Sequence, residues 1–213
     1  MGSRKAADGK SEPRSGNGIT AGELIAELEE RRRTDPVYRA QLEAVEAERE
    51  KRVRALRAAE EPIVKDLRDA GYDVNSVWDL GNKPVPYPAA FPVLLEHLRR
   101  GGYPDRVMES LGQALAVRAM APEWEVIKAL YLGARSPGEE TGLAVALAGS
   151  ATRDHLDELV ALLREESRGA TRIYFLRPIK RLGGDRGRAL LESLVDDPLF
   201  GREARALLKT RRR

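Results

Sequence analysis

Apolar residues recur along the second half of the chain with a period of about 32 residues. Successive members of one set are separated by 32, 33 and 31 residues, and those of a second set by 32 each time. Glycine or proline lies between the two sets in each period. Two apolar stripes per period predict helical hairpins that repeat along the chain. The first set is Leu98, Leu130, Leu163 and Leu194, and the second is Leu111, Leu143, Phe175 and Leu207.

A single helical hairpin cannot bury both of its apolar stripes. Stacking one hairpin on the next covers them, and each fully buried leucine-sized side chain then contributes roughly 1.5–3 kcal/mol. The sequence therefore predicts an all-α protein, a right-handed α-solenoid of about four hairpins, preceded by long charged N-terminal helices. The predicted regions are a disordered tail (1–19), N-terminal helices (20–70), a connector (71–88) and the repeat domain (89–213).

Four stretches of this region resemble the HEAT-repeat family in its short bacterial form: YPAAFPVLLEHL, YPDRVMESLGQALA, GLAVALAG and LDELVALL. The resemblance extends over residues 86–208, and its motif is specific for architecture rather than for function. HEAT proteins are mostly scaffolds that hold partners along a concave face. The resemblance implies the same role here, with the second helix of each hairpin lining the groove.

Helix start signals are clear near the N-terminus. Thr20 and Glu23 have the spacing of a capping box, which begins a helix that ends near Arg33. Asp35 caps the next helix and Pro36 occupies its first position. This second helix is long and rich in alanine, glutamate and arginine.

The long helix has a heptad-like seam that contains two arginines, and two interpretations of it stay open. The helix is either a solvated charged helix or a coiled coil through which the protein self-associates. The pair Glu61–Pro62 is expected to kink or restart the helix before Gly71 ends it. The seam residues are Tyr38, Leu42, Val45, Arg49, Arg52 and Leu56.

Pro178 departs from the repeat pattern because it falls inside the second helix of the third hairpin. Proline removes a main-chain hydrogen bond from a helix interior, so a kink is expected there. The kink is either a structural irregularity or a device that reshapes the groove.

The amino-acid composition excludes several classes of protein. The 213 residues contain no cysteine, so disulfides and thiolate chemistry are excluded. A segment that spans a bilayer needs about 20 apolar residues, and every charge-free stretch of this chain is much shorter. The first twenty residues carry no secretion signal. A cytoplasmic location is therefore expected. The net charge of +3 is uneven: residues 91–167 carry 8 basic and 12 acidic side chains, and residues 168–213 carry 13 and 5.

The predicted groove starts neutral and becomes basic toward the C-terminus. Its lining is found from positions opposite the apolar stripe of each second helix. The basic positions could engage successive anionic groups of a partner, or form a solvated face without a ligand. The predicted partner-binding residues are Glu109, Gln113, Arg172, Arg177, Lys180, Arg181, Arg205 and Lys209.

Signals of enzymatic chemistry are weak. The two histidines, His97 and His155, lie 58 residues apart with no carboxylate at metal-ligand spacing, and neither is expected to be catalytic. No phosphate-binding loop, dinucleotide fingerprint, nucleophile elbow or zinc-protease motif occurs. Trp78 and Trp124 are expected to be core or packing residues. We therefore expect no enzyme, cofactor or metal.

Two main functions remain. The first is a non-enzymatic module that binds a protein partner along the groove. The alternative is sequence-tolerant nucleic-acid binding by the basic C-terminal half, including the tail Arg211–Arg213, although aromatic platforms for bases are lacking. A third hypothesis is an assembly factor that dimerises through its N-terminal helices.

Overall fold

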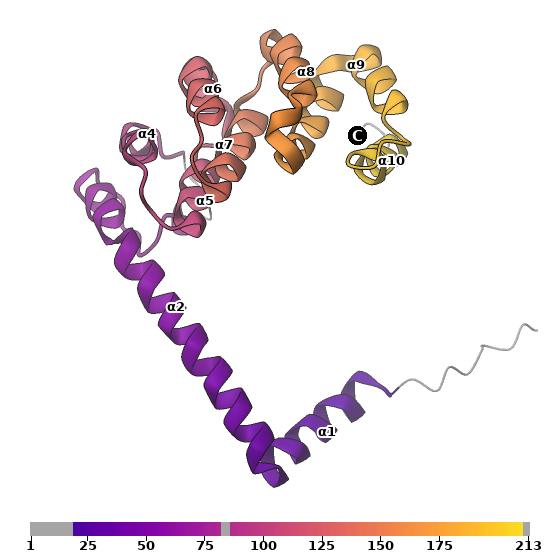
Figure 1. Ribbon diagram of the computed structural model, residues 1–213. Coiled ribbons are helices and arrows are strands. Elements are labelled where there is room, and N and C mark those ends of the chain that lie inside the picture. Colours follow the sequence, from indigo (N-terminus) through magenta and orange to yellow (C-terminus); the bar gives the residue numbers. More distant parts are fainter. Residues whose placement is uncertain (1–18, 82–85, 211–213) are drawn as a thin grey trace, which may run out of the picture. The chain divides into compact units, whose positions relative to one another are not determined.

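A computed structural model describes residues 19–81 and 86–210, in which all regular secondary structure is helical (Figure 1). The described residues exclude 1–18 of the predicted tail, 82–85 of the connector and the C-terminal Arg211–Arg213. Contacts divide the chain into two units, 1–51 and 52–213. The all-α prediction is confirmed for the described residues.

The first unit contains helix α1 (Ala21–Thr34) and the beginning of α2 (Pro36–Asp69). The predicted capping box is present: the Glu23 amide donates to Thr20 Oγ1 at 3.3 Å, and the Thr20 amide donates to Glu23 Oε2 at 2.8 Å. Asp35 Oδ1 caps α2 by accepting from two amides, each at 2.9 Å. No residue of α1 is buried.

Helix α2 continues through Pro62. Of the two outcomes expected at this proline, a kink or a restart of the helix, the restart is therefore wrong. The proline removes one hydrogen bond, while Ile63 and Leu67 in the following turns are fully buried and hold the helix in place. Beyond the helix, Gly71 has a φ of +92°, and the Tyr72 amide donates to the carbonyl of Leu67 at 3.0 Å. This 6→1 bond is the Schellman termination that a left-handed glycine permits.

The connector contains a short helix, α3 (Trp78–Gly81). Val74, Val77 and Leu80 are buried, and Asp79 Oδ2 accepts the amides of two preceding residues. The apolar side chains thus bring the connector into the core of the second unit.

The remaining helices of the second unit pack mainly on their neighbours along the chain (Figure 1). Helix α4 packs on α5, α6 on α7, α8 on α9 and α9 on α10, while α7 also contacts α5 and the 3₁₀ helix η3. Their bounds are α4 (Ala90–Arg100), α5 (Asp105–Ala114), η1 (Arg118–Glu123), α6 (Trp124–Leu132), α7 (Pro137–Ser150), η2 (Arg153–His155), α8 (Leu156–Arg164), η3 (Glu166–Phe175), α9 (Leu176–Ser193) and α10 (Gly201–Lys209).

The residues that define the period contribute to this core. Leu98, Leu111, Leu143 and Phe175 are fully buried, and Leu163 is 2% exposed. The remaining three periodic leucines are half-buried and pack against the same cluster. The periodicity therefore identified core positions, least completely in the last period, where Leu194 and Leu207 are both half-buried.

The break in α9 is at Gly184, so the kink expected at Pro178 is wrong. Pro178 lies in the first turn of α9, where its missing N–H removes little helical hydrogen bonding. Gly184 has φ 56° and ψ −128°, a conformation that side-chain-bearing residues rarely adopt, and it separates two helical halves. The two halves occupy the positions of the second helix of one predicted hairpin and the first helix of the next.

Helices α5 and α7 approach so closely that their main chains touch. A Cβ atom on Gly112 would lie 2.2 Å from the carbonyl carbon of Gly142, and one on Gly138 would lie 2.2 Å from the carbonyl oxygen of Asp105. Gly149, two turns further along α7, meets main-chain atoms just beyond α5 in the same way. These three α7 glycines lie on one side of the helix, and no larger residue fits there without displacing the main chain.

We predict that Gly112→Ala lowers the free energy of unfolding by about 1–3 kcal/mol or more, because the added methyl group overlaps the main chain of α7. Gly183→Ala in α9 is the matched control, since its nearest neighbour would be a leucine methyl at 3.4 Å. Urea denaturation measures both variants. Equal stabilities for the two would contradict the close packing of α5 on α7.

Candidate protein-binding surface

Two of the predicted groove residues lie together on α5. Gln113 Nε2 donates to Glu109 Oε1 at 2.9 Å, and Arg106 Nη1 donates to Glu109 Oε2 at 3.0 Å. Both Glu109 and Gln113 are half-buried. They lie on a helix that packs on α7, whereas the other six predicted residues belong to η3, α9 and α10.

Arg177 and Lys180 on α9 contact α10. Arg177 Nε donates to Glu203 Oε1 at 3.1 Å. Lys180 Nζ donates to the carbonyl oxygens of Leu207 and Thr210, the latter at 2.9 Å, and to Thr210 Oγ1 at 2.8 Å. The ammonium group therefore satisfies carbonyls at the C-terminal end of α10, where positive charge is also favourable to the helix dipole.

Three further predicted cations also donate to main-chain carbonyls within the chain. Arg172 donates to two carbonyls, at 2.9 and 3.1 Å, and its guanidinium lies 5.1 Å from the ring centre of Phe200. Arg181 donates to Ala151, and Arg205 to Val195. Sequence alone predicted a basic groove, and the structure gives most of its cations an internal bonding role.

We predict that Lys180→Met costs about 1–2 kcal/mol of unfolding free energy, because it leaves carbonyls of α10 without their charged donor. Lys209→Met is the control, since Lys209 is exposed in the last turn of the same helix. Chemical denaturation and amide exchange of α10 measure the effect. An unchanged α10 exchange rate in Lys180→Met would contradict this capping role.

His97 is buried, at 1% exposure, between elements that are distant in sequence. Its Nε2 lies 3.0 Å from Asp66 Oδ2 on α2, and its Nδ1 lies 2.6 Å from the hydroxyl of Tyr103. Both ring nitrogens are therefore engaged within the fold. The arrangement supports a structural link between the end of α2 and the α4–α5 connection.

A second polar cluster joins α6 to α8. Trp124 is 2% exposed, as expected for a core residue, and its ring stacks on that of His155 at 4.1 Å with an angle of 9°. Its Nε1 donates to Glu158 Oε2 at 3.0 Å, and Lys128 forms an ion pair with the same carboxylate. The cluster fixes α6 against the η2–α8 segment.

Hydrogen bonding sets the charges of this cluster. Hydrogen bonds to Glu125 and Glu158 raise the pKa of Lys128. Burial acts against ionisation of Glu158 and is the largest single effect, but the bonds from Lys128 and Trp124 together lower the pKa of Glu158. Both partners are thus stabilised in their charged forms, as expected for a structural ion pair.

Trp78 is not a core residue, although its ring packs against another side chain. Its side chain is 42% exposed, and the guanidinium of Arg106 lies 4.9 Å from the ring centre. Among the described residues, no group of three histidines or carboxylates is arranged to hold a metal ion.

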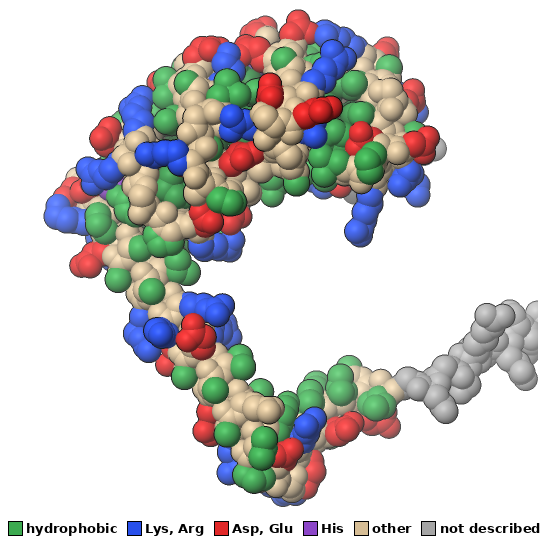
Figure 2. Space-filling model, in the orientation of Figure 1, with side chains coloured by type: hydrophobic (Ala, Val, Ile, Leu, Met, Phe, Trp, Pro, Cys, Tyr) green, Lys and Arg blue, Asp and Glu red, His purple; other side chains and the backbone are tan. Residues whose placement is uncertain are grey.

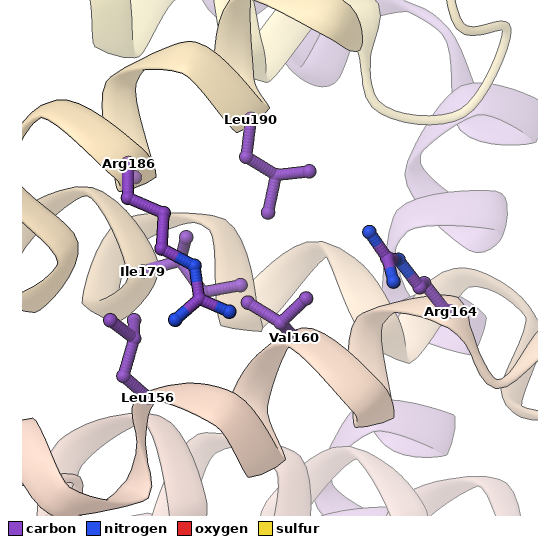
Figure 3. A pocket seen from close by; sticks show the side chains of 7 residues that line it. Leu156, Val160, Arg164, Ile179, Arg186 and Leu190 are labelled. Atoms are coloured by element: carbon purple, nitrogen blue, oxygen red, sulfur yellow. The ribbon is translucent and has the colours of Figure 1, made fainter.

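A pocket of about 240 Å³ lies between α8 and α9 (Figure 3). Leu156 and Val160 of α8 and Ile179 and Leu190 of α9 form its apolar lining, and two arginines stand at its sides. Sequence analysis placed Leu156 and Val160 in a HEAT-like stretch but did not foresee an opening beside them. It missed Arg164 altogether, because only the fold brings Arg164 and Arg186 to one pocket.

No family model, curated protein or solved structure matches this chain. Within the described part of the chain, no helix has the length and apolar character needed to cross a membrane.

Proposed function

We propose that α4 to α10 form a HEAT-like solenoid of four hairpins that acts as a non-enzymatic scaffold for a protein partner. The observation that carries this proposal is that the helices pack in the order in which they occur along the chain. Helix α7 contacts α5, which precedes it, and η3 and α9, which follow it. Such stacking builds an extended surface from successive repeats. Thr141 and Val145 on α7, like Glu109 and Gln113 on α5, are half-buried and supply mixed neutral and polar surface.

The internal bonding of the cations favours a protein partner over nucleic acid. Phosphate-led binding requires lysine and arginine side chains that are available to neutralise phosphates, which releases the counterions condensed on the nucleic acid. Here Arg172, Lys180 and Arg205 donate to main-chain carbonyls. Engaging a phosphate through Lys180 would break its bonds to the C-terminal end of α10.

Site-specific photocrosslinking tests the scaffold proposal. A photoreactive phenylalanine analogue is placed at Gln113 or Thr141, and at the exposed Glu96 of α4 as the control. In lysate of the native cells, we expect both groove positions to crosslink to the same protein and Glu96 not to do so. Crosslinking from Glu96 alone, or none from either groove position, would refute a partner held along the second helices.

Self-association through the N-terminal helices is a second candidate, because their apolar side chains are uncovered. On α1, Leu24 is 47% exposed and Ile25 is 57% exposed, and on α2 Val45 is 67% exposed. Figure 2 shows apolar side chains at the surface of both helices. An amphipathic helix normally buries such a stripe against another element.

Sedimentation of the full chain at tens of micromolar tests this second candidate. We expect a dimer that Val45→Asp dissociates, because Val45 lies on the heptad-like seam of α2. Val37→Asp is the matched control: Val37 is 65% exposed and lies off the seam. A monomeric wild-type chain, or equal effects of both variants, would argue against pairing through the seam.

A further inference from the structure

The pocket between α8 and α9 is an opening in otherwise close packing. Gly187 allows the second half of α9 to approach the first, since a Cβ there would lie 2.3 Å from the carbonyl oxygen of Ile179. Ile179 is fully buried beneath the pocket, whereas Leu156 and Leu190 are half-buried at its walls. Apolar surface is thus held open to solvent by a rigid contact between the two halves of one helix.

The volume of the pocket restricts its ligand. Small-molecule sites typically enclose about 300–1,000 Å³. At about 240 Å³, this pocket is smaller, and its size suits one or two large apolar side chains. An apolar anchor that projects from a peptide fits it better than a whole metabolite.

The two arginines give the pocket its charge preference. In Figure 3, the guanidinium groups of Arg186 and Arg164 lie on either side of Val160. Arg164 is exposed in the last turn of α8, while Arg186 Nη1 pairs with Asp157 Oδ1 at 2.6 Å. Both members of that pair are largely exposed, so a competing carboxylate can replace Asp157 at little cost.

We propose that this pocket binds a segment of a partner protein in which a large apolar side chain is flanked by aspartate or glutamate. The apolar side chain enters between Leu156, Val160 and Leu190, and the flanking carboxylates pair with Arg164 and Arg186. None of these residues belongs to the predicted groove. The inference therefore goes beyond groove binding and does not require it.

Selection from a displayed library of random linear peptides on the full-length protein tests the proposal. We expect a consensus of one large apolar residue with neighbouring acidic residues. The synthetic consensus peptide, labelled for fluorescence anisotropy, should bind about tenfold or more weakly to the double variant Arg164→Ala, Arg186→Ala. Increasing the salt concentration should also weaken binding of the peptide to the wild-type protein, because salt screens the pairing of its carboxylates with the two arginines.

The double variant Arg153→Ala, Arg188→Ala is the matched control. It removes the same charge from exposed positions, and Arg188 pairs with Glu192 on the same helix as Arg186. We expect this control to bind the peptide as the wild type does, with both double variants retaining the wild-type melting temperature. A failure to select peptides, a basic consensus, or equal binding by the two double variants would overturn the proposal. Loss of groove crosslinking with intact peptide binding would refute the groove alone.

Discussion

The contact between α5 and α7 is the constraint on which the arrangement of the second unit depends. Glycines on both helices remove the side chains that would hold the main chains apart, and Gly112 of α5 faces Gly142 of α7 directly. Because α7 also contacts α6, η3 and α9, its position relative to α5 sets where the later helices begin. Leucine burial stabilises these helices, but the glycines determine how closely they lie.

The second unit uses long polar side chains to complete its helix ends. Lys180 satisfies carbonyls of α10, Arg172 bonds to the end of α8, and His97 links α4 to α2. The Lys180 and His97 bonds join elements far apart in sequence, and all three residues satisfy polar groups at a helix boundary or interface. A high content of arginine and lysine therefore need not indicate a charged ligand, since part of that charge is used by the main chain.

Local signals were read reliably from the sequence, and long-range partnerships were not. The Thr20 capping box and the buried periodic leucines follow from spacing within one helix or one period. The glycine spacing of α7 was visible, but nothing in the sequence names α5 as the helix that it meets. The carbonyl acceptors of the predicted groove cations were equally hidden, because main-chain carbonyls carry no sequence signature. The kink expected at Pro178 was wrong because α9 begins at Leu176. Pro178 therefore lies in the first turn of the helix and not in its interior.

Gly184 joins two helical halves directly, where a loop would otherwise connect them. Loops absorb changes in length, whereas each residue added to a helix rotates everything beyond it by about 100°. An insertion between Gly184 and Leu190 would turn Leu190 and the buried Leu191 away from their present neighbours. This part of the chain therefore has little freedom to vary in length during evolution.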